Sequence, residues 1–269
     1  DSLPAAVACT RTLCGYDSVK KPPTPVQDTT EDALNDTTAT TLPLTRIQRL
    51  IGARMLASKR NKPCYYMEIR ADVTELMGMR HGLSRALGVK VTTGTFYMRA
   101  MAVAARQHPL MVGRLASGGH SNNGDGYLVQ AENVNVGFAV NSPQGLVVPV
   151  VRYAEGLSLA EIAEEEKVLT DKARSNKLTL EDIEGETIAL SNLGAYDIDS
   201  FLAIVPPQVS AIVAAGKIIP AVVPQDEGPV VRKMVSLTLT ADQRVIPCDY
   251  AARFLHCLAE QLSDPEWLV

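Results

Sequence analysis

The chain has 269 residues, of which 46% are hydrophobic and 21% are charged, and its formal net charge is −4. This composition is ordinary for a globular protein with a substantial core, and the acidic balance gives no general attraction to nucleic acid or to an anionic membrane. The longest apolar region, residues 201–223, is interrupted by prolines and a lysine, so it is expected to be buried core rather than a membrane span.

The five cysteines and four histidines show no spacing that is typical of a disulfide framework or a metal site. An odd number of cysteines without a C-x-x-C pair argues against a disulfide framework and against zinc. A reducing compartment is therefore the expected location. These residues are Cys9, Cys14, Cys64, Cys248, Cys257, His81, His108, His120 and His256.

Residues 1–42 differ in composition from the rest of the chain. They are rich in proline, threonine and acidic residues and show no sustained hydrophobic period, which predicts a flexible linker or arm. The alternative is an arm that docks on a neighbouring subunit. Residues 43–269 are expected to form a single domain.

The first half of this domain is predicted to be mainly helical. Thr45 and Gln48 have the spacing of a capping box and predict a helix over 46–60. A strand over 65–73 and a helix over 74–87 follow, the latter ended by Gly88. A further helix over 95–108 is stopped by Pro109. The Gly-, Ser- and Asn-rich residues 117–126 predict an exposed hairpin loop without a phosphate-binding pattern.

Strands dominate the second half. Apolar side chains alternate from Val134 to Val140, which predicts a half-buried strand, and the continuous apolar run 146–151 predicts a strand buried on both faces. Ser158 and Glu161 are predicted to cap the next helix. The remaining expected elements are strands over 187–191, 209–215 and 235–239 and a last helix from Asp249 with Ala252, Leu255, Leu258, Ala259 and Leu262 inward. This mixture predicts an α/β fold with layers around a mixed sheet.

Five segments, in this order, resemble the catalytic core of the 2-oxo-acid dehydrogenase acyltransferases (E2). They are residues 43–55 (PLTRIQRLIGARM), 132–140 (ENVNVGFAV), 145–151 (GLVVPVV), 191–194 (SNLG) followed by 206–208 (PPQ), and 262–266 (LSDPE). The resemblance covers residues 43–269. It implies a chloramphenicol acetyltransferase-like α/β core with a mixed sheet and flanking helices. It also implies trimers that build larger cores, with each active site between two subunits.

The family signature Asp-His-Arg-x-x-Asp-Gly is degenerate in this chain, where the matching residues are Asp242, Gln243, Arg244, Pro247 and Cys248. In the family the histidine is the general base that deprotonates the attacking thiol, and the second aspartate pairs with the arginine. A positioned base contributes roughly 10²–10⁴-fold to rate, and the amide of Gln243 cannot hold and return a proton. Proline and cysteine at the last two positions predict a rebuilt turn. The resemblance therefore implies that no catalytic site is intact.

Three further residues are candidates around this motif. Ser191 matches the serine whose hydroxyl stabilises the oxyanion in the family, and is either a vestige of that site or the polar end of a strand. His256 is expected to be a surface or interface residue rather than a substitute base. Cys248 is expected to be a buried structural cysteine rather than a new nucleophile.

The resemblance favours a non-catalytic core subunit similar to the inactive E3-binding subunits (protein X) of mitochondrial pyruvate dehydrogenase complexes. Such a subunit would form homotrimers, bind the acyltransferase core, recruit dihydrolipoamide dehydrogenase through a domain outside this chain, and reside in the mitochondrial matrix. No nucleic-acid or membrane partner is expected. No cofactor is expected in this chain, although active relatives use CoA and a lipoyl group.

Two alternatives remain open. The chain could be an active dihydrolipoamide acyltransferase with a non-standard base or substrate-assisted deprotonation. It could also be an unrelated CoA-dependent acetyltransferase of the same fold.

Overall fold

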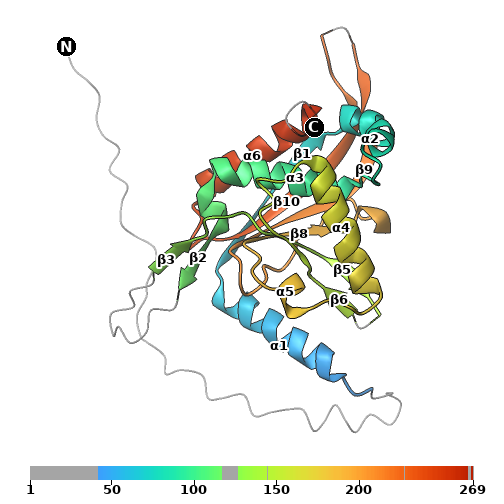
Figure 1. Ribbon diagram of the computed structural model, residues 1–269. Helices are drawn as coiled ribbons and strands as arrows, with labels where there is room; N and C mark the ends of the chain where they lie inside the picture. The colour runs from blue at the N-terminus through green and yellow to red at the C-terminus, as the bar shows by residue number, and fades with distance from the viewer. Residues whose placement is uncertain (1–41, 117–126, 144, 227, 266–267, 269) are drawn as a thin grey trace, which may run out of the picture. The chain divides into compact units, whose positions relative to one another are not determined.

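A computed structural model of the chain describes residues 42–116, 127–143, 145–226, 228–265 and 268 (Figure 1). Thr45–Val269 forms one compact unit. The predicted linker 1–42, apart from Leu42, and the predicted hairpin loop 117–126 lie outside the described residues. No helix among the described residues is long and apolar enough to cross a membrane.

A six-stranded sheet in the order β1-β10-β9-β8-β4-β7 forms the centre of this unit. β8 pairs in parallel with both β4 and β9, whereas the other neighbours are antiparallel, so the sheet is mixed as predicted. The strands are β1 (Cys64–Asp72), β4 (Val136–Phe138), β7 (Val150–Val151), β8 (Ile188–Asn192), β9 (Ala211–Val223) and β10 (Val230–Asp242). Two small two-stranded sheets are formed by β2 (Gly113–Ala116) with β3 (Tyr127–Gln130), and by β5 (Val140–Ser142) with β6 (Gly145–Val147).

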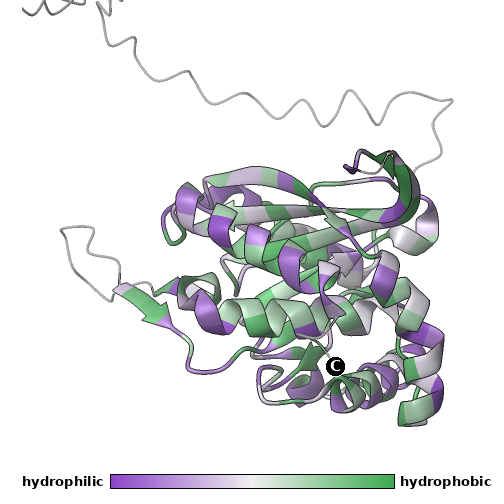
Figure 2. Ribbon diagram, turned by 90° about the horizontal axis from the view of Figure 1, so that it is seen from above, coloured by the Kyte–Doolittle hydropathy of each residue, from purple (hydrophilic) through white to green (hydrophobic). Residues whose placement is uncertain are grey.

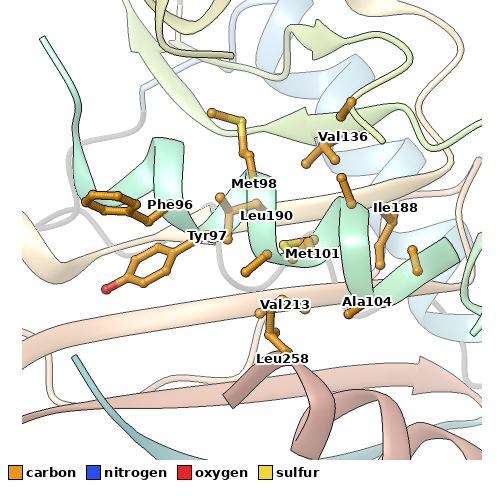
Figure 3. Close-up of a cluster of buried hydrophobic side chains, with 14 of the residues drawn as sticks. Phe96, Tyr97, Met98, Met101, Ala104, Val136, Ile188, Leu190, Val213 and Leu258 are labelled. Carbon is orange, nitrogen blue, oxygen red and sulfur yellow. The ribbon is translucent and has the colours of Figure 1, made fainter. Parts of the chain in front are cut away.

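Helices pack against this sheet to form the main core. Figure 3 shows Met98 and Met101 of α3 gathered with Leu190 of β8, Val213 of β9 and Leu258 of α6. In Figure 2 the helices carry hydrophobic and hydrophilic residues side by side, as expected of helices with one buried face. The helical segments are α1 (Arg46–Asn61), α2 (Thr74–Leu87), α3 (Thr93–Gln107), η2 (Pro109–Val112), α4 (Leu159–Arg174), α5 (Leu180–Ile183), η3 (Gly194–Tyr196) and α6 (Cys248–Ser263).

The other face of the sheet is covered by irregular chain rather than by a helix. Val205 and Val209 pack there with Ile212 of β9 in a second, small apolar cluster. The hydroxyl of Thr238 donates to the carbonyl oxygen of Phe201. Because both faces of the sheet are covered here, consecutive residues at the end of β10, up to Asp242, are all buried.

The local helix signals in the sequence are confirmed. Thr45 with Gln48 and Ser158 with Glu161 form reciprocal capping boxes at the starts of α1 and α4. Gly88 ends α2 with φ 69°, in the left-handed region that glycine adopts at low cost.

Several strand predictions were wrong in their extent. The expected strand from Val134 to Val140 divides at residue 139, because β4 pairs with β7 and β8 whereas Val140 begins the separate β5–β6 hairpin. The expected strand over 146–151 divides at Pro149, which has no N–H to donate, and Leu146 is 54% exposed rather than buried.

The last helix also departs from its prediction. It begins at Cys248 rather than Asp249, and Ala252 is exposed whereas Ala251 and Phe254 are buried. The predicted inward positions Leu255, Leu258, Ala259 and Leu262 are confirmed as buried.

Candidate active site

The degenerate motif forms the turn that joins β10 to α6. The carboxylate of Asp242, whose side chain is only 2% exposed, accepts hydrogen bonds from Nε and Nη2 of Arg244 at 3.0 and 2.7 Å. The backbone N–H of Arg244 donates to the same carboxylate at 3.1 Å. This hydrogen-bonded carboxylate raises the pKa of the Arg244 guanidinium. The arginine therefore neutralises the first aspartate of the motif within the same turn.

Backbone hydrogen bonds hold the turn closed. The N–H groups of Val245 and Ile246 donate to the carbonyl oxygen of Asp242, and the N–H of Gln243 donates to the carbonyl oxygen of Pro63. The Tyr65 hydroxyl donates to the carbonyl oxygen of Ile246 at 3.0 Å. These bonds tie the turn to β1 and to the chain that precedes it.

Pro247 and Cys248 begin the helix instead of forming a glycine-dependent turn. Pro247 is the N-cap residue, with φ −63° and ψ 146°, and Cys248 is the first residue of α6. A missing N–H is tolerated at the start of a helix, because the first N–H groups have no intrahelical partner. Cys248 is exposed, so the prediction of a buried cysteine was wrong: Cys248 and Asp249 lie on the solvent side of the first turn of α6, whereas Ala251 lies on its buried side.

Gln243 has an exposed side chain in this turn. Its amide group has no hydrogen-bond partner among the residues that the structure describes; only its backbone N–H is bonded. An amide does not take up and return a proton near neutral pH, so the Gln243 side chain cannot act as a general base.

Two residues beside the turn were not predicted as part of the site. The ammonium group of Lys62 donates to the carbonyl oxygens of Pro206, Pro207 and Val209 at 2.6, 3.1 and 2.5 Å, and burial lowers its pKa. Cys64 lies opposite Asp242 in the β1–β10 register. Burial and the Asp242 carboxylate raise the pKa of the Cys64 thiol, which disfavours the nucleophilic thiolate.

Ser191 lies in a different place, on β8, where it lines a groove of about 1100 Å³. Its hydroxyl has no hydrogen-bond partner in the described part of the chain. The neighbouring Asn192 does make local bonds: its side-chain oxygen accepts from the N–H of Gly194 at 3.0 Å, and its amide donates to Thr93. The strand-end interpretation thus applies to Asn192, while Ser191 presents its side chain to the groove.

A partly buried carboxylate forms part of the same groove. Glu166 of α4 accepts hydrogen bonds from the hydroxyls of Thr92 and Thr95 at 2.6 to 2.9 Å, at the N-terminus of α3. Burial raises the pKa of Glu166 even though these hydroxyls oppose the change. A Cβ at Gly94 would lie 2.9 Å from the Glu166 carboxylate, so a larger residue there would displace the end of the Glu166 side chain.

The opposite wall of the groove is held by close backbone packing. A Cβ on Gly216 would lie 1.9 Å from the carbonyl oxygen of Asp199, so no side chain fits there. Next to it, the ammonium group of Lys217 binds the carboxylates of Asp197 and Asp199 at 3.0 and 3.1 Å. Gly216 and Lys217 thus fix the segment that follows Ser191.

One chain does not bring Ser191 and the turn together. Ser191 lies opposite Ala214, Ala214 lies opposite Thr238, and Asp242 follows Thr238 on β10. Strands about 4.8 Å apart with a rise of about 3.4 Å per residue place Ser191 and Asp242 roughly 17 Å apart. No residue from 242 to 248 lines the groove.

None of the three described histidines belongs to the turn, and His81 lies on the exposed side of α2. Nδ1 of His108 lies 3.0 Å from the carbonyl oxygen of Ala104, and its ring packs edge-on against Tyr250 and Phe254. His256 lies on the surface, as predicted, and its Nε2 is 3.2 Å from the carboxylate of Glu260.

Residues 36–269 match the model of the family described as 2-oxoacid dehydrogenases acyltransferase (catalytic domain). The chain belongs to this acyltransferase family. The acetyltransferase component of the Schizosaccharomyces pombe pyruvate dehydrogenase complex is 32% identical over 229 residues, which cover 83% of this chain and 46% of that protein. The mouse pyruvate dehydrogenase protein X component is 31% identical over 234 residues, covering 85% and 45%. The chain thus spans about half the length of these acyltransferase-family relatives.

Solved structures of the acyltransferase family agree with the fold. The cubic core of a pyruvate dehydrogenase multienzyme complex superposes with a TM-score of 0.81 at 31% identity, covering 93% of this chain and 100% of that chain. A probable dihydrolipoamide acetyltransferase from Listeria monocytogenes superposes with a TM-score of 0.76 at 26% identity, covering 83% and 94%. The predicted α/β fold of an acyltransferase core is confirmed.

Proposed function

We propose that this chain is a non-catalytic core subunit of a pyruvate dehydrogenase complex. The observation that carries the proposal is Gln243, an exposed amide at the position where the family signature has its general base. A free thiol has a pKa of about 8.5 and is mostly protonated at neutral pH. Transfer to that thiol therefore needs a proton acceptor, and an amide is not one.

No neighbouring group in the described residues supplies the missing base. The raised pKa of the Cys64 thiol disfavours its thiolate, and the Lys62 ammonium group donates hydrogen bonds to three carbonyl oxygens. His108 and His256 make their contacts with Ala104 and Glu260. The expected loss is the roughly 10²–10⁴-fold that a positioned base contributes.

A relative with a studied mechanism supports this interpretation. In the dihydrolipoamide acetyltransferase of Azotobacter vinelandii, which is 31% identical and superposes with a TM-score of 0.80, the catalytic roles of a serine, a histidine and an asparagine were investigated. Gln243 and Pro247 have the same spacing as that histidine and asparagine, and neither can replace its counterpart chemically.

We also propose, from the family relationship, that the chain is part of a larger assembly. Its trimers would bind the acyltransferase core of the complex, in the mitochondrial matrix, and another domain of the whole protein would recruit dihydrolipoamide dehydrogenase. No resident cofactor is required for this role. Mitochondrial relatives from fission yeast and mouse support the location, although a Rickettsia bellii acetyltransferase component is also 30% identical.

A second candidate is an active dihydrolipoamide acyltransferase with a non-standard base. The groove and the unbonded Ser191 hydroxyl favour it, because an oxyanion-stabilising donor could act there once a second copy completed the site. Most of the named relatives are acetyltransferase components.

Acetyl transfer from acetyl-CoA separates these candidates. The purified chain is offered dihydrolipoamide or a small amine acceptor. No transfer to either supports the structural subunit, transfer to dihydrolipoamide supports the active acyltransferase, and transfer only to the amine contradicts both.

A further inference from the structure

The groove that Ser191 lines contains a deeply buried tyrosine whose hydroxyl has no acceptor. Tyr97 of α3 is 3% exposed and lines the groove, and its hydroxyl has no hydrogen-bond partner in the described part of the chain. Figure 3 shows this hydroxyl directed away from the apolar cluster around Met98 and Met101. Helix side chains lean toward the helix N-terminus, so the Tyr97 ring extends toward the first turn of α3. A tyrosine this deeply buried normally finds a partner for its hydroxyl, so the missing partner points to a ligand.

The first turn of α3 adds two more donors to the same groove. Thr93 and Gly94 line it, and their backbone N–H groups have no hydrogen-bond partner among the residues that the structure describes. The N–H groups of Thr92 and Thr95, by contrast, donate to each other's hydroxyls. The first N–H groups of a helix lack intrahelical acceptors and lie at the positive end of the helix dipole, so they attract anions.

Basic side chains surround this end of the groove. Lys90 lies just before α3, whereas Lys167 and Arg174 come from α4. None of these three forms an ion pair with a described residue. The charged residues that line the groove together with Glu166 are Lys90, Lys167, Asp171, Arg174, Asp197 and Lys217. Because Lys217 is paired with Asp197, the unpaired charge near α3 is mainly positive.

Glu166 supplies an anion to this end of the groove from within the chain. Its carboxylate accepts hydrogen bonds from the Thr92 hydroxyl at 2.8 and 2.9 Å and from the Thr95 hydroxyl at 2.6 Å. One carboxylate oxygen lies 2.9 Å from the position that a Cβ of Gly94 would take. The carboxylate therefore covers the first turn of α3, where an anion from solvent would meet the helix N-terminus.

We infer that Glu166 is an internal competitor at a site for tetrahedral oxyanions, such as sulfate and phosphate groups, which bind when its carboxylate is neutral or removed. The Tyr97 hydroxyl and the N–H groups of Thr93 and Gly94 would hold such an anion, with the basic side chains beside them. Two negative charges at one helix N-terminus repel each other, so the ionised carboxylate opposes the incoming anion. Burial raises the pKa of Glu166, so its competing charge is lost at a higher pH than that of an exposed glutamate. The inference goes beyond the proposed function, because it concerns what the groove binds and not whether acyl transfer occurs.

Sulfate is a suitable probe because it keeps its double charge between pH 5 and pH 7.5. Glu166→Gln removes the competing charge, whereas Glu164→Gln makes the same charge change at an exposed position of α4 that does not line the groove. Affinity is measured by titration calorimetry at constant ionic strength, with circular dichroism as the check on folding. Glu166→Ala takes the place of Glu166→Gln if that variant does not fold.

At pH 7.5, Glu166→Gln should bind sulfate roughly tenfold more tightly than the wild type, and Glu164→Gln should match the wild type. The wild type should gain affinity as the pH falls to 5, and Glu166→Gln should gain less. Other groups titrate equally in both proteins, so this difference isolates Glu166. Adding Tyr97→Phe to Glu166→Gln should weaken binding by roughly tenfold through the lost hydrogen bond.

The inference is overturned by equal sulfate affinity of the wild type and Glu166→Gln, by binding to neither, or by an equal gain in Glu164→Gln. Undiminished affinity after Tyr97→Phe also overturns it, because sulfate then binds elsewhere. Inorganic phosphate and glycerol phosphate, offered to Glu166→Gln, distinguish a free anion from a phosphate ester as the ligand. Each of these results leaves the proposed function standing, since acetyl transfer tests that separately.

Discussion

Arg244 closes a two-pronged ion pair on Asp242, two positions before it in the chain, at the junction of β10 and α6. Pro247, three positions after the arginine, carries no charge, so Asp242 is the carboxylate that this turn offers to Arg244. The pair keeps a nearly inaccessible carboxylate neutralised next to Gln243. Two residues of a catalytic signature therefore persist in a structural role that does not depend on the lost histidine.

This ion pair should contribute to stability. Arg244→Ala leaves the buried Asp242 carboxylate without its cation, which costs about 3–5 kcal/mol when a fully buried pair is broken. Because the Arg244 side chain is 43% exposed, solvent compensates part of the loss, and we expect a decrease in unfolding free energy of roughly 2 kcal/mol. Urea unfolding measures it, with the exposed Arg114→Ala as a control. A decrease below about 0.5 kcal/mol, the range of ordinary surface changes, would show that the pair is not structural.

Restoring histidine alone should not restore catalysis. Gln243→His returns an imidazole to the turn, but Pro247 and Cys248 remain the start of α6, so position 247 still offers no polar side chain to the imidazole. We expect acetyl transfer to stay within about tenfold of background, since positioning as well as pKa determines the contribution of a base. Rates that reach those of an active acyltransferase core would disprove this view of the turn.

The groove wall should tolerate no side chain at Gly216. Gly216→Ala brings a Cβ against the carbonyl oxygen of Asp199, which forces the segment beside Ser191 to move and should cost roughly 1–3 kcal/mol as an overpacking change. Gly82→Ala on α2 is the matched control, because its Cβ meets nothing within 4 Å. The control should raise stability by about 0.5–1 kcal/mol through helix propensity. Equal effects in both variants would contradict the packing described here.

Glu166 should make stability depend on pH. Burial raises its pKa in the folded chain above the ordinary value for a glutamate, so the folded state holds the proton more tightly than the unfolded state. Its contribution is fully present below pH 4.5 and is lost as pH rises through the folded pKa. Glu166→Gln should therefore raise the melting temperature at pH 7 but not at pH 4, whereas Glu164→Gln, at an exposed position, should change neither. An equal effect of Glu166→Gln at both pH values would count against this assignment.

Local signals in the sequence predicted more of this structure than long-range ones. The caps at Thr45 and Ser158 depend on residues three positions away, and both formed as predicted. The length of β9 and β10 depends on their pairing with each other, so the predicted strands 209–215 and 235–239 were too short. Starting α6 one residue late placed Ala252 inward in place of Ala251.

The sequence singled out residues 242–248 as a candidate site but not the residues that surround them. The seven-residue signature showed by its sequence that histidine is missing at position 243. The involvement of Lys62 could not be seen in the same way, because its carbonyl partners lie more than 140 positions later in the chain. The exposure of Cys248 follows from where α6 begins, which periodicity defines only approximately.

The central claim is that the chain lacks the base that acyl transfer requires. The most direct test is the steady-state rate of acetyl transfer from acetyl-CoA to dihydrolipoamide at neutral pH, compared with an active acyltransferase core at equal subunit concentration. The chain should be slower by at least the roughly 10² that a positioned base contributes, and indistinguishable from the uncatalysed background. A rate within tenfold of the active core would mean that another group deprotonates the thiol, and would contradict the claim.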